Sequence, residues 1–133
     1  MRTTVIDCSR SPGPGYPAPE PVRKGKFVQI WQGDAAEYFV CAPRALATYH
    51  ANLVQRFLDE RGVAGRYNEK RDTFWHDDER WVVLGGGHFT LDTQARTLWL
   101  SGASMAYGTF EPAGLAERLA ASVVLAGYEI TVE

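Results

Sequence analysis

Three short segments of this chain combine a polar side chain with small residues or glycines, which is the composition of a pocket for an anionic oxygen. They are residues 49–51 (Tyr-His-Ala), 84–88 (Leu-Gly-Gly-Gly-His) and 102–108 (Gly-Ala-Ser-Met-Ala-Tyr-Gly). Small residues allow main-chain N–H groups to approach an anion closely, and such groups form phosphate sites. Together the segments predict an oxyanion or phosphate pocket that holds one histidine.

The first segment lies where a polar loop turns into an amphipathic helix, which we expect over residues 48–61. Thr48 is a good N-cap residue, and it would place Tyr49, His50 and Ala51 at the first three helical positions. The N–H groups of those positions have no partner inside the helix, and the helix dipole adds partial positive charge. These donors can therefore hold an anion.

Further donors to the same anion are expected from a loop and a lysine. A loop from Ser104 to Ala106 adds backbone N–H groups, and Lys26 could bring a full positive charge. Phosphate is the anion that this arrangement suits. The alternative is a helix that begins near Arg44, which would make His50 a mid-helix residue with a structural role.

Four segments, in this order, resemble motifs of the protein-histidine phosphatase (janus/ocnus) family. They are residues 26–30 (Lys-Phe-Val-Gln-Ile), 49–51, 84–87 and 104–108 (Ser-Met-Ala-Tyr-Gly). The resemblance covers roughly residues 26–133. It implies an α/β or α+β sandwich in which a mixed β-sheet carries one helix on each face.

The resemblance also implies what the site residues do. By its place in the motif, His50 is the catalytic residue, either as general base or as the nucleophile that forms a phosphohistidine intermediate. No metal ion or other cofactor is required. The substrate is then phosphohistidine on a protein or peptide, or a small N-phosphorylated molecule. The expected phosphate-binding residues are Lys26, Tyr49, Ala51, Ser104 and Ala106, with Ser104 and Ala106 contacting phosphate through hydroxyl and backbone.

One residue departs from the family pattern. Members have arginine after the three glycines, whereas this chain has His88. An arginine carries a permanent charge, but the charge on a histidine depends on pH, so the choice of substrate is expected to differ. His88 either points into the pocket as a proton donor or lies on the solvent face of a strand. The glycines themselves are either a pocket wall or a place where backbones pack closely.

Length and composition favour one globular domain. The chain has 133 residues, of which 45% are apolar and 23% charged, and a formal net charge of −2, which argues against a nucleic-acid partner. No apolar run is long enough for a membrane span, and no signal peptide is recognisable, so we expect a cytoplasmic monomer. The two cysteines form no metal or disulfide pattern. The adjacent polar residues 76–79 (His-Asp-Asp-Glu) are interpreted as a solvated turn rather than a metal site.

The first 25 residues are interpreted as a flexible tail, and residues 26–133 as the folded domain. Five of the seven prolines fall within residues 12–21, together with two glycines. Such a segment neither forms a helix nor pairs as a strand, although it could serve as a docking segment.

Within the domain, strands and helices alternate along the sequence. A hairpin is expected from residues 27–31 and 38–41, and another from strands near residues 89–91 and 97–100. A second helix is expected from Pro112 to Gly127, followed by a last strand over residues 128–132. This order agrees with an α/β or α+β sandwich.

Two classes of function follow from the sequence. The favoured one is an enzyme, a metal-independent phosphatase acting on a phosphoramidate such as phosphohistidine, with phospholysine as a related substrate. The other is a noncatalytic protein that keeps the pocket to recognise phosphorylated partners. The same fold recruited to a different small-molecule reaction is a further alternative. Retention of both His50 and Lys26 favours the enzyme, because recognition needs donors but no base.

Overall fold

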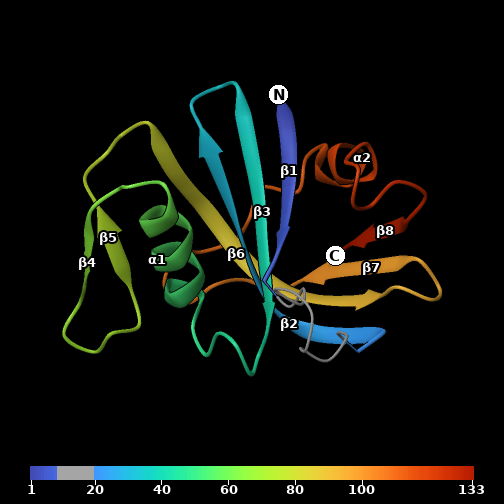
Figure 1. The fold of residues 1–133 in the computed structure, drawn as a ribbon, viewed down its shortest axis with the longest axis horizontal. Helices are drawn as coiled ribbons and strands as arrows, with labels where there is room; N and C mark the ends of the chain where they lie inside the picture. The colour runs from blue at the N-terminus through green and yellow to red at the C-terminus, as the bar shows by residue number, and fades with distance from the viewer. Residues whose placement is uncertain (9–19) are drawn as a thin grey trace.

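The computed structural model describes residues 1–8 and 20–133 and shows an α+β fold. A six-stranded, mixed and curled sheet has the strand order β1-β3-β2-β6-β7-β8, and β4 and β5 form a separate two-stranded sheet (Figure 1). The elements are β1 (Arg2–Asp7), β2 (Val22–Gln32), β3 (Ala36–Pro43), α1 (His50–Glu60), β4 (Gly65–Tyr67), β5 (Phe74–His76), β6 (Trp81–Asp92), β7 (Thr97–Ser101), α2 (Leu115–Ala120) and β8 (Glu129–Val132).

The two predicted hairpins form the centre of this sheet. β2 and β3 are antiparallel across a turn in which Gly33 has φ +54°, a conformation that glycine adopts without a steric penalty. β6 and β7 are antiparallel across a turn in which the carboxylate of Asp92 accepts hydrogen bonds from two backbone N–H groups. The long strands β2 and β6 pair with each other and join the two hairpins.

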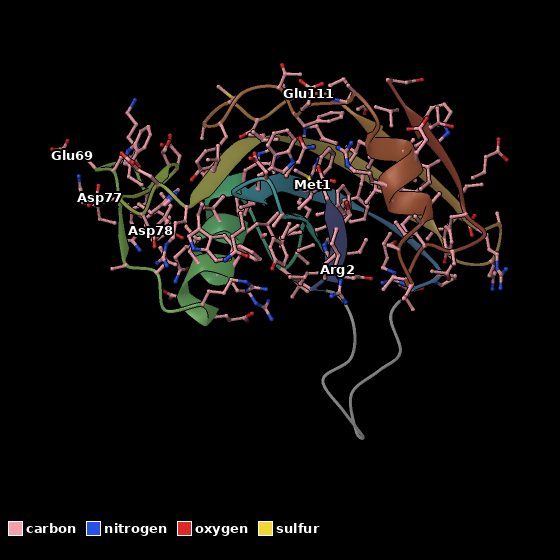
Figure 2. The ribbon with its side chains drawn as sticks, turned by 90° about the horizontal axis from the view of Figure 1, so that it is seen from above. Met1, Arg2, Glu69, Asp77, Asp78 and Glu111 are labelled. Carbon is pink, nitrogen blue, oxygen red and sulfur yellow. The ribbon has the colours of Figure 1, made fainter. Side chains whose placement is uncertain are left out.

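One helix covers each face of the sheet, as predicted. Alternate residues of a strand point to opposite faces, so Val28 and Phe27 of β2 belong to different apolar clusters. Val28 packs in the cluster that contains the apolar residues of α1, and Phe27 packs in the one that contains Leu115 and Leu119 of α2. Figure 2, viewed from above, shows α1 and α2 at opposite ends of the sheet.

Helix α1 begins one residue later than predicted. Tyr49 is the N-cap residue in place of Thr48, and the N–H of Tyr49 donates to Oδ1 of Asn52 at 2.9 Å. A start near Arg44 is wrong, because residues 44–46 form a turn ahead of the helix. Gly62, with φ +71°, follows the end of the helix as predicted. His50 is therefore the first helical residue.

Helix α2 is much shorter than predicted. It ends at Ala120, and Val123, which lies within the predicted helix, is outside it and 95% exposed. The hydroxyl of Ser122 donates to the carbonyl oxygen of Leu119 at 2.5 Å and accepts from the N–H of Leu125 at 3.4 Å. These side-chain bonds replace the helical pattern and turn the chain toward β8.

The interpretation of residues 1–25 as a flexible tail is wrong for the described part of that segment. Arg2–Asp7 form β1, which pairs in parallel with β3, and β2 already begins at Val22. Residues 2–6 contain four β-branched side chains ahead of the prolines, and β-branched residues favour strands. Residues 9–19, with four of the prolines, lie outside the described residues.

A buried carboxylate joins β1, β2 and β3 to α2. Glu37 of β3 is fully buried and accepts hydrogen bonds from side chains of four residues. Burial alone would raise its pKa, but these bonds outweigh it and lower the pKa of Glu37 to about 2. Sequence reasoning did not identify this network, whose donors are Thr3, Gln29, Trp31 and Arg118.

Candidate functional site

The three segments singled out in the sequence meet around one cavity of about 470 Å³. It lies at the N-terminal end of α1, between that helix, strands β2 and β6, and the loops before β5 and after β7. Six of the seven residues expected at the site line it, and Ala51 is the exception. The lining residues are Lys26, Thr48, Tyr49, His50, Asp72, Thr73, His88, Ala103, Ser104, Met105 and Ala106.

Ala51, expected to bind substrate through its first-turn N–H group, does not line the cavity with its side chain. Ala51 is fully buried in the apolar cluster beneath α1, because the second position of this helix faces the sheet. Its N–H nevertheless belongs to the first turn, where the helix itself supplies no acceptor. Any contact of Ala51 with an anion would therefore be made by the backbone.

His50 is held against the sheet by one hydrogen bond. Its Nε2 atom lies 2.9 Å from the carbonyl oxygen of Gly87, and only 6% of the residue is exposed. A carbonyl oxygen can only accept, so Nε2 must carry the proton, and in the neutral ring Nδ1 is then the atom with the free electron pair. Within the described residues, no group hydrogen-bonds to Nδ1.

The close approach of the His50 ring requires a glycine in β6. A Cβ atom at Gly86 would lie 2.8 Å from Cδ2 of His50 and 2.5 Å from the carbonyl oxygen of Phe27. Neither Gly86 nor its glycine neighbours line the cavity. The glycines therefore support the histidine from behind, which matches close backbone packing rather than a pocket wall.

The environment of His50 favours its neutral form. Burial lowers the pKa of His50 below the ordinary value near 6.5, and the hydrogen bond with Gly87 opposes this shift only in part. Charges on His88 and Lys26 lower the pKa further. At neutral pH the ring is thus an imidazole with an available base, and not a cation.

Lys26 supplies positive charge at the cavity. It lies in β2 directly opposite His88 of β6, on the face of the sheet that α1 covers. Its side chain is half-buried, and no described residue forms a hydrogen bond or ion pair with its ammonium group. A half-buried ammonium without a counter-ion favours the binding of an anion.

The loop after β7 contributes fewer backbone donors than predicted. The N–H of Ser104 donates to the carbonyl oxygen of Gly108 at 3.0 Å, so it is not available to a ligand. The N–H groups of Met105 and Ala106 have no acceptor among the described residues. The hydroxyl oxygen of Ser104 accepts from the N–H of Tyr107 at 3.1 Å, which leaves the hydroxyl proton for a ligand.

Tyr107 and Met105, on either side of Ala106 in this loop, have different environments. The Tyr107 hydroxyl donates to the carbonyl oxygen of Phe74 and accepts from its N–H, both at 2.8 Å, and thereby ties the loop to β5. Met105 is fully exposed at the rim of the cavity. Tyr49, the N-cap residue of α1, is half-exposed and also lines the cavity.

His88 lies in the cavity, but its environment does not favour a cation. Its ring centroid is 5.9 Å from that of His50, and the two rings meet edge to face. Burial lowers the pKa of His88, and the charges of Lys26 and Arg44 lower it further. Gly102 makes room for the ring, because a Cβ atom there would lie 2.9 Å from Cδ2 of His88.

Five lining residues were not predicted as site residues: Thr48, Asp72, Thr73, Ala103 and Met105. Thr48 and Met105 are sequence neighbours of predicted residues, so the motifs contained a signal for them. Asp72 comes from the polar stretch between β4 and β5, where no periodic pattern marks a position. Only the folded chain shows that this stretch lines the same cavity as His50.

The comparisons with known proteins give no family for this chain. No protein-family model and no curated protein matches it. Among residues 1–8 and 20–133, three or more His, Cys, Asp or Glu side chains nowhere gather as a metal site would require, and no helix is long and apolar enough to cross a membrane. Membership of the protein-histidine phosphatase family therefore remains a prediction from the four motifs.

Proposed function

We propose that this protein is a phosphatase that hydrolyses a phosphoramidate, with phosphohistidine on a protein or peptide as the favoured substrate. One observation carries the proposal: a neutral histidine whose Nδ1 atom is open lies in the same cavity as an unpaired, half-buried lysine. The first group can take a proton from water, and the second can bind phosphate.

The donors around the cavity suit a phosphoryl group. Lys26 provides a charge, and the first N–H groups of α1, at His50 and Ala51, provide dipoles that point out of the helix. The N–H groups of Met105 and Ala106 lie in the loop on another wall. Donors on several walls can contact different oxygens of one phosphoryl group, whose charge is spread over its equatorial oxygens during transfer.

In the mechanism that we favour, water attacks phosphorus in line with the leaving nitrogen. Nδ1 of His50 accepts the proton of the water, while the backbone donors and Lys26 stabilise the charge on the phosphoryl oxygens. These groups perform each step without a metal ion. In the second mechanism, Nδ1 itself attacks phosphorus and a phosphohistidine intermediate forms. Trapping of labelled phosphate on His50 would identify the second mechanism.

The rim of the cavity favours a polypeptide substrate over a small one. Met105 is fully exposed and Tyr49 is 48% exposed, and both line the cavity. Large apolar side chains exposed beside a polar site are typical of surfaces that bind another protein or a peptide. The flexible thioether of methionine can adapt to different flanking residues.

The rival function is recognition of a phosphorylated partner without catalysis. A neutral His50 contributes no charge to anion binding, and its unprotonated Nδ1 atom cannot donate a hydrogen bond to phosphate. A pocket that serves only for binding would gain more from a cation or a donor at this position. The orientation of His50 therefore favours hydrolysis.

The test is release of inorganic phosphate from a phosphohistidine peptide, with a chelator present. We expect repeated turnover that the chelator does not reduce. The rival function predicts binding of the peptide with no release of phosphate. Phosphate release that stops in the chelator and returns with an added metal ion would contradict the metal-independent mechanism.

A further inference from the structure

Asp72 is the only acidic residue among the described residues that line the cavity, where the other charged group is Lys26. We propose that Asp72 binds the leaving group of the substrate, and that this leaving group is an imidazole whose remote ring nitrogen donates its N–H to the carboxylate. The inference rests on the proposed function and adds the residue that binds the leaving group.

The carboxylate of Asp72 is held in place by its own loop. Oδ1 of Asp72 accepts from the side-chain amide of Asn68 at 2.6 Å and from the hydroxyl of Thr73 at 3.3 Å. The carbonyl oxygen of the Asn68 side chain accepts from the N–H groups of Asp72 and Thr73 at 3.0 and 3.1 Å. These contacts fix the start of β5 and orient the carboxylate before a ligand arrives.

The second carboxylate oxygen has no partner in the described part of the chain. No hydrogen bond is made to Oδ2 of Asp72, and no ion pair joins Asp72 to a cationic side chain. A carboxylate in a cavity that otherwise suits an anion would repel phosphate. It is compatible with phosphate only if the substrate brings an N–H donor or a positive charge to this wall.

A phosphorylated imidazole carries a phosphoryl group and an N–H donor on opposite sides of one ring. One ring nitrogen carries the phosphoryl group, and the other can carry a proton. Lys26 lies on β2 and Asp72 lies in the loop before β5, so the two charges come from separate elements that meet at one cavity. A phospholysine has a single nitrogen, bonded to phosphorus, and offers no remote N–H.

This assignment also identifies the proton that the leaving group needs. With its remote nitrogen protonated and held by Asp72, the ring is cationic. As a water oxygen bonds to phosphorus, the water proton passes to Nδ1 of His50 and the electron pair of the broken P–N bond passes to the ring nitrogen. The ring leaves as neutral imidazole, with its remaining N–H still on Asp72. No separate acid is consumed, so neither His88 nor another residue has to protonate the leaving nitrogen.

The experiment compares wild type with Asp72→Asn in one assay with two readouts. The readouts are kcat/KM for a phosphohistidine peptide and the inhibition constant of inorganic phosphate, which has no leaving group. Asparagine keeps the acceptor that holds Asn68 but removes the charge. Asp77→Asn is the matched control, because Asp77 directly follows β5 and is an exposed carboxylate that does not line the cavity (Figure 2). Thermal unfolding verifies that each variant is folded.

We expect Asp72→Asn to lower kcat/KM by about ten- to a hundredfold, since a hydrogen bond to a charged group is lost. Inhibition by phosphate should stay the same or strengthen, because a repulsive charge is removed. Wild-type kcat/KM in Asp72→Asn would overturn the inference. A rise in the inhibition constant of phosphate as large as the loss of kcat/KM would also overturn it, because it would show a general change in the cavity. Failure of the proposed function is distinct from both, since wild type itself would then release no phosphate.

Discussion

Nε2 of His50 lies 2.9 Å from the carbonyl oxygen of Gly87. This contact between α1 and β6 assigns the ring proton to Nε2 and leaves Nδ1 as the base. The backbone of Gly87 can come so close to the ring only because its neighbour, Gly86, has no side chain. The catalytic orientation of His50 thus depends on a glycine that does not line the cavity.

A methyl group at Gly86 should displace the His50 ring. We expect Gly86→Ala to lower kcat/KM at least tenfold and the free energy of unfolding by about 1–3 kcal/mol, since the new Cβ would overlap Cδ2 of His50 and the backbone of Phe27. Gly33→Ala is the control. It lies in a turn with φ +54° and open space around it, so it should lose about 1 kcal/mol of stability and no activity. Wild-type kcat/KM in Gly86→Ala would show that the ring position is not critical.

Removal of the Lys26 ammonium should weaken phosphate binding. We expect Lys26→Ala to raise the inhibition constant of inorganic phosphate roughly ten- to a hundredfold, because a charge-assisted hydrogen bond is lost. Lys24→Ala is the matched control, since Lys24 belongs to the same strand but is exposed and lies outside the cavity. Equal inhibition constants for the two variants would remove Lys26 from the site.

The pH dependence of activity follows from the lowered pKa of His50. A base is active when unprotonated, so kcat/KM should fall as pH falls through a pKa below the usual histidine value. Burial also lowers the pKa of His88, so its environment does not favour a charged ring at neutral pH. His88→Arg adds a permanent charge and should lower the pKa of His50 further, which shifts the acid limb to lower pH. An identical pH–rate profile for the two proteins would place His88 outside the electrostatic reach of the base.

Parts of this architecture were predictable, and the reasons differ from element to element. The hairpins and the start of α1 follow from turn residues and apolar periodicity, which are local signals. Strand β1 was missed because the prolines that follow it dominated the interpretation of the segment. Asp72 and Glu37 were missed for another reason. Asp72 lines a cavity formed by segments far away in sequence, and Glu37 bonds to Arg118, which is 81 residues away. No local pattern contains such a pairing.

The Glu37 network should make stability depend on acid pH. Because the folded-state pKa of Glu37 is lowered to about 2, its contribution is present above the unfolded value near 4.3 and is lost as pH falls toward 2. We expect Glu37→Gln to lower the free energy of unfolding by about 2–3 kcal/mol at pH 7, because Arg118 loses its buried partner. Urea unfolding at pH 7 and near pH 3 measures this. If the difference in free energy of unfolding between wild type and Glu37→Gln did not decrease in acid, Glu37 would not be the source of this pH dependence.

Strand β1 should contribute to stability, although the sequence favoured a flexible tail here. We expect deletion of residues 1–8 to lower the melting temperature by several degrees, because it removes the parallel pairing with β3 and the hydrogen bond from Thr3 to Glu37. Thr4→Ala, at an exposed position of the same strand, is the control and should change little. An unchanged melting temperature after the deletion would show that β1 adds nothing to the fold.

The central claim is that His50 performs the chemistry and is not a structural histidine. The most direct measurement is phosphate release from a phosphohistidine peptide by His50→Ala and by His76→Ala, at a temperature where both are folded. His76 is a matched control, because its Nε2 also contacts a backbone carbonyl, that of Trp81 at 2.6 Å, but it does not line the cavity. Our account predicts that His50→Ala lowers kcat at least a hundredfold and that His76→Ala keeps wild-type turnover. Turnover by His50→Ala at the wild-type rate would contradict the account.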